Sequence, residues 1–458
     1  MILRNAVHRG VMVDVEMTNG IITAVMPASG GFHSGDIDAD GDRVMPGLWD
    51  EHVHIRSWAQ FIQRANLLAA PDADAVVEIL RSHPTDGVEP IVGHGLRWAL
   101  WPKQPTISAL DAVSETQPVF AFSMDVHSVW VNSFAARQYG LVKEAGETGI
   151  LREHDCFRLL TALGDIGDEE MDSLVEIAAM DARNKGIVGI TSFEMESLTD
   201  WDRRVAKGFD TIKVNASLYA DRIEEAFRRG VQTGDRLAGT VSMGYLKVIT
   251  DGSINTKTAY MHEPFCGTDV TGVLNTNETE LERLVRAAAE HGVIPALHAI
   301  GDRANTVVID TFEKVGVRGR IEHAQMVRPD DVARMARLGL TASVQPAHAV
   351  DDRDVADALW CERTDYAYPM KSFLRAGVPL VFGSDAPVAP LDPWHTIRMA
   401  VDRTADDRPA WHPDEALTMD EAIACSTRST IEVGQPADVI TVDDDWKVTA
   451  TLVAGRID

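Results

Sequence analysis

Two histidines stand one residue apart near residue 50, directly after a short apolar run. In the segment MPGLWDEHVHI they are His52 and His54. If this run is a β-strand, residues two apart point to the same side, so both imidazoles face one way. Neutral imidazole is a ligand for zinc and other divalent transition metals. The pair is therefore either half of a metal site or a coincidence of spacing, and residues elsewhere in the chain must decide.

Other short apolar runs farther along the chain also end in a histidine, an aspartate or a lysine. These residues are Lys247, Asp251, His298, His323, His348 and Asp385. Five of the 15 histidines thus stand at predicted strand ends. One histidine at a strand end is more often a hydrogen-bonded structural residue than a ligand. The joint occurrence with Asp385 instead favours a divalent metal site, because imidazole and carboxylate are the usual ligands of such ions.

The elements that must position these residues alternate between two patterns. Eight short β-branched or apolar runs are predicted as strands, at 44–55, 186–195, 209–219, 245–253, 293–301, 320–325, 340–349 and 378–387. Amphipathic stretches such as 277–292 and 328–339 lie between several of them and end in glycine, which is typical of helices. Strands that are apolar on both faces and alternate with helices predict an α/β fold, a (β/α)₈ TIM barrel. Catalytic side chains of such a barrel lie at the carboxyl ends of its strands, so the residues above would meet at one mouth.

The two ends of the chain and one long segment depart from this alternation. Residues 1–45 and 432–458 both read as short strands around turns, and we expect one small β-sandwich domain built from both termini. Two unrelated caps are the alternative. Residues 46–431 would form the barrel domain. Within it, residues 56–168 far exceed one crossover and are predicted to be an insertion subdomain after the first barrel strand. Its tryptophans, among them Trp98, would either line an apolar pocket or form its core.

Composition narrows the range of partners. The 70 acidic residues outnumber the 43 basic ones, and the formal charge of −27 disfavours nucleic acid and anionic membranes as partners. No Gly-x-Gly-x-x-Gly pattern suits a nucleotide, and no apolar run is long enough for a transmembrane helix. The N-terminus lacks the apolar core of a signal peptide. The four cysteines are far apart and are expected to be structural thiols in a reducing compartment. We expect a cytoplasmic protein with a small-molecule substrate, and homo-oligomerisation is left open.

At the level of whole motifs, the chain resembles a known superfamily. PGLWDEHVHI is similar to the Pro-Gly-x-x-Asp-x-His-x-His opening of the amidohydrolase superfamily. Five further blocks resemble those of the amidohydrolase-3 type, the branch of N-substituted formamide deformylase. They are LKVITDGSINTKTAYMHEPF, LHAIGDRAN, RIEHAQ, SVQPAHAVDD and FGSDAPVAPLDPW. SMDVHSVWVNSFAARQYG, residues 123–140, resembles the insertion of that branch. The motifs occur in order over nearly the whole chain, which makes the resemblance specific.

The resemblance implies one or two divalent metal ions at the barrel mouth, zinc being the expected metal. The residues that match the ligand positions of the family are His52, His54, Lys247, His298, His323 and Asp385. The first two histidines, with Asp385, would bind the more buried ion, and the two later histidines would bind the second.

Lys247 matches a lysine that is carboxylated in many superfamily members and bridges both ions. A free ammonium repels a divalent cation, so Lys247 suits this place only as the carbamate or as a neutral amine. A salt bridge between Lys247 and Asp251 is the alternative.

The implied activity is hydrolysis of a non-peptide C–N bond in an amide, an N-formyl or N-acyl amine, or a cyclic amide. A metal-activated hydroxide would attack, with Asp385 as general base and then general acid. His127, His348, Asp251 and Trp98 are candidates for contacting the substrate, although each of them has a structural alternative. Carbamate or ester hydrolysis and ring deamination would use the same site. A non-catalytic barrel is a third possibility, but it would be expected to lack some of the ligands.

Overall fold

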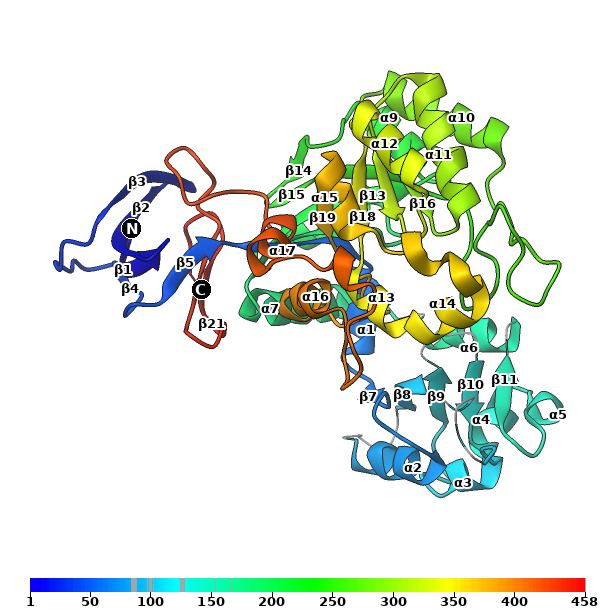
Figure 1. Cartoon of the computed structure of the whole chain (residues 1–458). Helices are drawn as coiled ribbons and strands as arrows, with labels where there is room; N and C mark the ends of the chain where they lie inside the picture. The colour runs from blue at the N-terminus through cyan, green and yellow to red at the C-terminus, as the bar shows by residue number, and fades with distance from the viewer. Residues whose placement is uncertain are drawn as a thin grey trace. The chain divides into compact units, whose positions relative to one another are not determined.

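A computed structural model describes residues 1–83, 89–96, 98, 101, 103–123, 128–152, 154–164 and 166–457 (Figure 1). Its largest sheet contains eight parallel strands that form a nearly closed barrel. In chain order they are β6 (Leu48–Val53), β12 (Ile187–Ser192), β13 (Lys213–Tyr219), β15 (Val241–Ile249), β16 (Pro295–Ala299), β17 (Arg320–His323), β18 (Thr341–Val344) and β19 (Leu380–Phe382). A short strand, β14 (Arg236–Ala238), pairs antiparallel with β15. The predicted TIM barrel is therefore confirmed.

The barrel closes where the segment after β19 meets β6. The backbone N–H of Asp385 donates to the carbonyl of His52 over 2.7 Å, and Val53 and Ala386 form a parallel bridge. The buried carboxylate of Asp50 accepts from the backbone N–H of Ser384, with both oxygens at 3.0 Å. The ends of the first and last strands thus lie side by side, as a barrel mouth requires.

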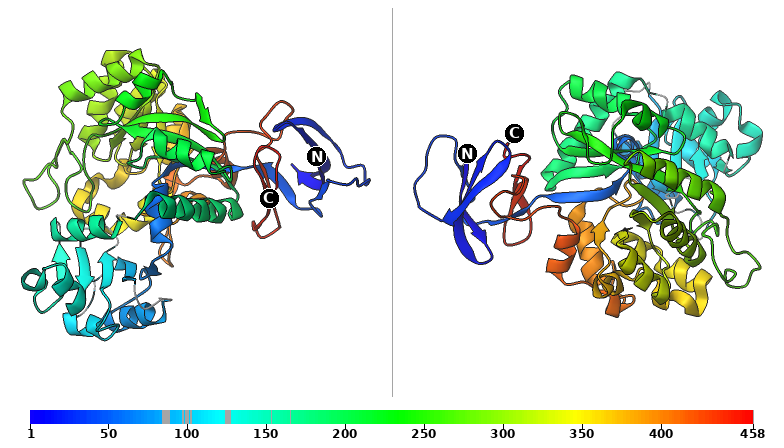
Figure 2. Two further views of the ribbon diagram at one scale, coloured as in Figure 1. Left: turned by 180° about the vertical axis from the view of Figure 1, so that it is seen from behind. Right: turned by 90° about the horizontal axis from the view of Figure 1, so that it is seen from above.

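Helices follow most of the barrel strands and lie around them (Figure 2). They are α8 (Leu198–Ala206), α9 (Glu224–Arg229), α10 (Glu278–Glu290), α11 (Asp302–Val315), α12 (Pro329–Leu338), α13 (Pro346–Asp351), α14 (Arg353–Trp360), α15 (Met370–Ala376), α16 (Pro393–Asp402) and α17 (Met419–Cys425), with short 3₁₀ turns η2 (Cys361–Tyr366) and η3 (Pro413–Glu415). Local sequence explains their ends. The Asn277 side chain caps α10 by accepting from the backbone N–H of Glu280, and Gly339 ends α12 with a φ of 64°. Because none of the described helices is long and apolar enough, none could cross a membrane.

Strands from both ends of the chain join in one seven-stranded sheet. They are β1 (Ile2–His8), β2 (Val11–Thr18), β3 (Ile21–Pro27), β4 (Ile37–Asp38), β5 (Arg43–Pro46), β20 (Val439–Val442) and β21 (Val448–Leu452). The central join is antiparallel, with Val439 opposite Pro46. Leu3, Val15 and Leu452 are fully buried in its core, and strands from near both ends of the chain belong to this sheet (Figure 1).

Residues 56–178 form a second compact unit with a sheet of its own. Its strands are β7 (Ala65–Asn66), β8 (Ile91–Leu96), β9 (Val119–Ser123), β10 (Ser128–Val131) and β11 (Ile150–Arg152), and the helices of this part of the chain are α1 (Ile55–Phe61), α2 (Ala73–Ser82), α3 (Ile107–Asp111), α4 (Ser133–Gln138), α5 (Val142–Ala145), α6 (His154–Gly164) and α7 (Asp168–Asn184). The Trp98 indole donates to Ser128 Oγ over 2.9 Å and packs against the core that holds Trp130. These contacts support a place in the core for Trp98 rather than a contact with substrate.

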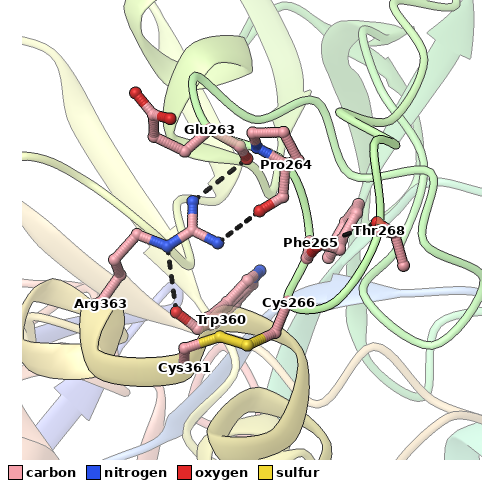
Figure 3. The surroundings of a disulfide bond; sticks show 8 residues. All are labelled: Glu263, Pro264, Phe265, Cys266, Thr268, Trp360, Cys361 and Arg363. Carbon is pink, nitrogen blue, oxygen red and sulfur yellow. Dashed lines mark hydrogen bonds between the residues drawn. A yellow bond between two sulfur atoms is a disulfide. The ribbon is translucent and has the colours of Figure 1, made fainter.

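The expectation that all four cysteines are thiols is wrong for two of them. Cys266 and Cys361 form a disulfide across 95 residues of sequence, with their Cα atoms 5.9 Å apart (Figure 3). Arg363 joins the same two segments, because its guanidinium donates to the carbonyls of Glu263 and Pro264 over 3.1 and 2.7 Å. The loop after β15 is therefore tied to the turn after α14. Cysteine spacing does not indicate this pairing, since it is made by the path of the loop.

Replacing Cys266 with serine is expected to lower the free energy of unfolding by about 2 to 5 kcal/mol, because the cross-link restricts a long loop in the unfolded chain. Urea unfolding of the variant and of wild-type protein, each with and without reductant, measures the difference. Reductant should lower the wild-type midpoint and leave the variant unchanged. An effect of reductant on the variant equal to that on wild type would contradict the role of this bond.

A capping interaction on α17 predicts a pH dependence of stability. Hydrogen bonds from the Lys371 ammonium and from the backbone of Thr418 lower the pKa of Glu421 from an ordinary value of 4.5 to about 2. A carboxyl group whose pKa is lower in the folded state stabilises the fold above pH 4.5, and the contribution disappears as the pH falls toward 2. The difference in unfolding free energy between wild type and Glu421→Gln should therefore shrink over this range. A constant difference, measured by urea unfolding at several pH values, would show that the pKa is not perturbed.

Candidate metal centre

One aspartate and two histidines meet where the barrel closes. His52 lies on β6, His54 follows that strand, and Asp385 follows β19. Asp385 Oδ1 lies 3.3 Å from His54 Nε2 and 3.5 Å from His52 Nε2. The His52 side chain is fully buried, whereas that of His54 is 25% exposed. The group therefore combines a buried candidate ligand with one that solvent can reach.

A second group shares the same aspartate. It consists of His323 at the end of β17, His348 and Asp385, and their ligand-capable atoms lie within 4.8 Å of one another. His348 Nε2 is 3.8 Å from Asp385 Oδ2, and the rings of His323 and His348 lie nearly parallel with centroids 6.1 Å apart. The prediction that His348 ends a strand over 340–349 is wrong, because β18 ends at Val344 and His348 belongs to helix α13. Pro346 begins this helix, since it cannot donate a backbone hydrogen bond to a continuing strand.

The two groups have the chemistry and the spacing that a divalent cation needs. Because zinc binds histidine nitrogen and carboxylate oxygen at about 2.0 to 2.2 Å, two ligand atoms on one ion lie roughly 3 to 4 Å apart. The three histidine–Asp385 distances above fall in this range. His323 Nδ1 and His348 Nε2 are buried and have no hydrogen-bond partner in the described part of the chain. Such an unpaired buried nitrogen is costly, and binding to a cation would remove the cost.

Backbone geometry at two of the candidate ligands is unusual. His323 and Asp385 have φ values of 72° and 57°, in the left-handed region that residues with a side chain rarely adopt. Conformations of this kind cost about 1 to 3 kcal/mol each and concentrate at functional sites. Both residues stand directly at the barrel mouth, where a strand turns into a loop.

His298 is held from behind by Asp251. The His298 Nδ1 atom lies 3.0 Å from Asp251 Oδ1, and the same carboxylate accepts from the backbone N–H groups of Tyr260, Ile300 and Gly301. A carboxylate on one ring nitrogen orients the other nitrogen toward a ligand position. Asp251 is fully buried and bonded to His298, which favours a supporting role over the predicted contact with substrate. The His298 ring centroid is 4.5 Å from that of His323, but His298 is part of neither group of three.

Lys247 points into the centre from β15. Its Nζ lies 3.3 Å from His52 Nε2 and 4.6 Å from the ring centroid of Phe193. Burial lowers the pKa of Lys247 to about 8, although Glu322 and Asp385 oppose the shift. The amine is therefore more easily uncharged than an exposed lysine. Among the described residues no salt bridge joins Lys247 to Asp251, whose carboxylate is bonded to His298 and the backbone instead.

A buried chain of charges holds His52 in place. Glu322 Oε2 accepts from His52 Nδ1 over 2.7 Å, and Arg320 donates to Glu322 Oε1 over 2.7 Å. Arg320 also donates to Glu51 over 2.8 Å, and Glu51 pairs with Arg428. Burial and then Lys247 lower the pKa of His52 to about 4, so its ring is neutral at pH 7. No role is assigned to Glu322 or to the two arginines from the sequence, although Arg320 and Glu322 both belong to the RIEHAQ block around His323.

Charge favours an ionised Asp385. Burial alone would raise the pKa of this carboxyl, but the neighbouring His52, His54 and His323 hold it well below its ordinary value. The Asp385 carboxylate likewise raises the pKa of His54 against the opposite effect of burial. Asp385 therefore supplies the negative charge that both histidine groups share.

Of the remaining predicted site residues, His127 lies outside the described residues.

A parallel barrel with histidines and a carboxylate at the carboxyl ends of its strands is typical of metal-dependent barrel hydrolases. The particular family follows from the sequence: the chain belongs to the amidohydrolase family, whose pattern matches residues 36–455.

Similar proteins match most of this chain. The protein LONG AFTER FAR-RED 3 of Arabidopsis thaliana is 28% identical over 438 residues, which cover 86% of this chain and 74% of that protein. N-substituted formamide deformylase of Arthrobacter pascens is 25% identical, over 89% of this chain and 85% of the enzyme. The crystal structure of an uncharacterized metal-dependent hydrolase from Pyrococcus horikoshii has a TM-score of 0.81 at 24% identity and covers 100% of this chain and 99% of that one. This likeness supports the same fold.

Proposed function

We propose that this chain is a metal-dependent amidohydrolase that cleaves a non-peptide C–N bond in an amide, an N-formyl or N-acyl amine, or a cyclic amide. The observation that carries the proposal is the position of Asp385, whose two carboxylate oxygens face two different histidine groups at the barrel mouth. The similarity to a formamide deformylase, an enzyme named for cleaving an N-formyl group, supports this choice of bond. The position of Asp385 and the sequence similarity to this enzyme therefore support the same proposal.

The chain's own residues suit such a hydrolysis. His52, His54 and Asp385 would hold a divalent ion, which supplies Lewis-acid polarisation of a carbonyl and lowers the pKa of water. The ionised Asp385 accepts a proton from the attacking water and later delivers it to the leaving nitrogen. A C–O bond forms, the C–N bond breaks, and a carboxylic acid and an amine leave. Glu322 orients the His52 ring by accepting a hydrogen bond from its Nδ1–H, whereas burial and Lys247 keep the ring neutral.

Lys247 has two possible forms at this site. As the uncharged amine or the carbamate, Lys247 would offer a ligand atom to the ion, whereas a charged ammonium would repel it. Because the pKa of Lys247 is lowered to about 8, the uncharged form that reacts with carbon dioxide is accessible near neutral pH. Mass spectrometry of the native protein would detect the added carboxyl group.

A screen of substrates tests the function. Metal-free protein, and protein loaded with zinc or manganese, would be assayed against N-formyl amines, N-acyl amines, cyclic amides, carbamates, aryl esters and aminated rings. We expect hydrolysis of at least one amide-type C–N bond, lost on chelation and restored by metal. Cleavage of carbamates, esters or ring amines alone would reject the amide proposal in favour of its alternatives at the same site. Metal-loaded protein inactive on every compound would support a non-catalytic barrel.

A further inference from the structure

We propose that Arg403 binds a small monovalent anion, of which chloride is the simplest example. Arg403 is the residue that caps the end of helix α16, and its side chain is fully buried. The inference is independent of the metal centre and of the proposed hydrolysis, because it rests on the charge and the hydrogen bonds of this one guanidinium group.

The guanidinium of Arg403 lacks acceptors for most of its donors. Its Nε donates to the backbone carbonyl of Trp411 over 3.0 Å. Nη1 and Nη2 are both buried, and neither has a hydrogen-bond partner within the described part of the chain. An arginine side chain carries five N–H donors, and a buried donor that is left unpaired is costly, more so when the group is charged. Most of the N–H groups of Arg403 therefore need an acceptor.

The positive charge of Arg403 has no direct counter-charge. Burial lowers the pKa of this group to about 10, although Glu415 and Tyr368 oppose the shift, so it remains charged at pH 7. Glu415 is nearby, but its two carboxylate oxygens accept from the backbone N–H and the hydroxyl of Ser372. A buried charge without a partner is far more costly than a buried neutral group. The surroundings of Arg403 thus favour an anion over a water molecule as its partner.

Other buried arginines in the ranges that the structure describes have the acceptors that Arg403 lacks. Arg4, Arg204 and Arg320 pair with carboxylates, and Arg183 donates to backbone carbonyls. Burial of a guanidinium in this protein is therefore normally accompanied by several acceptors. Arg403 departs from that pattern, which indicates that its acceptor is not supplied by the chain itself.

The neighbours of Arg403 suit a small ion. Its Cζ lies 5.8 Å from the ring centroid of Trp411, and the next residue, His412, has a buried Nε2 that also lacks a partner among the residues described. Burial and then Arg403 lower the pKa of His412, so its ring is neutral and can donate one hydrogen bond. Because protein encloses the guanidinium, a bulky anion is excluded. Residues 404–410 are largely exposed, and a local opening of this segment would admit the ion.

Urea unfolding at constant ionic strength tests the inference in the intact protein. Sodium gluconate, whose anion is too large for the enclosed position, would be replaced stepwise by sodium chloride. Once chloride exceeds its dissociation constant, each further tenfold increase should lower the unfolding equilibrium constant of wild type by about tenfold, because the ion binds only the folded state. An unfolding equilibrium constant that is the same at every chloride concentration would overturn the inference.

Two variants assign the chloride dependence to Arg403. Arg403→Met removes the charge at similar length and should lose the dependence, and it should destabilise the protein less in gluconate, where the wild-type charge is unpaired, than in chloride. Arg408→Met is the matched control, because it replaces a 43% exposed arginine of the same segment, and it should keep the dependence of wild type. A chloride dependence in Arg403→Met equal to that of wild type would also overturn the inference.

Crystals of wild-type protein grown with sodium bromide give a readout that needs no variant. Bromide replaces chloride and is located by its anomalous scattering. We expect an anomalous peak within hydrogen-bonding distance of Arg403 Nη1 or Nη2. A water molecule at this place, a protein acceptor on both nitrogens, or bromide bound only at the exposed surface would show that Arg403 does not bind an anion.

Discussion

Asp385→Asn is expected to lower kcat/KM by about 100- to 10,000-fold, the range that a general acid–base residue contributes. Asparagine keeps the size of the side chain but cannot take a proton from water or return it to nitrogen. It also removes the charge that faces both histidine groups, so metal affinity should fall as well. Assays with saturating metal separate the two effects, because they leave only the loss of proton transfer.

The matched control for this variant is Asp330→Asn, which replaces an exposed aspartate in the first turn of α12. It should retain wild-type turnover and metal content. Full activity of Asp385→Asn on a substrate that wild type hydrolyses would show that another group carries the proton.

Arg320→Met is expected to lower the free energy of unfolding by about 3 to 5 kcal/mol, because it leaves the buried carboxylate of Glu322 without its arginine and that of Glu51 with Arg428 alone. The Arg320 side chain is 5% exposed and pairs with Glu322 and Glu51 over 2.7 and 2.8 Å. Methionine has similar length, so the loss reflects charge more than volume. Urea unfolding measures it, and metal affinity should also fall because Glu322 orients His52.

Two further variants make the Arg320 result interpretable. Arg320→Met combined with Glu322→Gln removes both charges of one pair and should recover part of the lost stability. Arg337→Met, whose side chain is 61% exposed and pairs with Glu313 on the surface, should change stability by less than about 1 kcal/mol. An Arg320 variant as stable as the Arg337 variant would refute the importance of the buried chain of charges.

Much of the architecture is predictable because it depends on local pattern. Short apolar runs alternating with amphipathic stretches are sufficient for a parallel barrel, and each of the eight predicted runs overlaps one of the eight barrel strands. Residues at the ends of such strands must meet at one mouth, which explains why the sequence alone groups His52, His323 and Asp385. The loops are less predictable. The sequence pattern puts His348 at a strand end, yet it lies on a helix that Pro346 begins.

Partners separated by long stretches of chain are not predictable in the same way. Cys266 and Cys361 pair because a loop returns to the turn after α14, and Asp251 turns inward to hold His298 because three backbone N–H groups gather around its carboxylate. Neither contact follows from spacing, since each depends on the path of a loop that has no periodic pattern.

The sequence by itself predicted the barrel, and it proposed one sheet domain built from both chain ends and a set of histidines and carboxylates that could bind a metal. These follow from periodicity and from the fixed direction of parallel strands. Only the tertiary structure decided how the set is divided: Asp385 offers one oxygen to His52 and His54 and the other to His348. The reason is that side-chain direction at a strand end depends on backbone conformation and loop packing, which local sequence patterns do not specify.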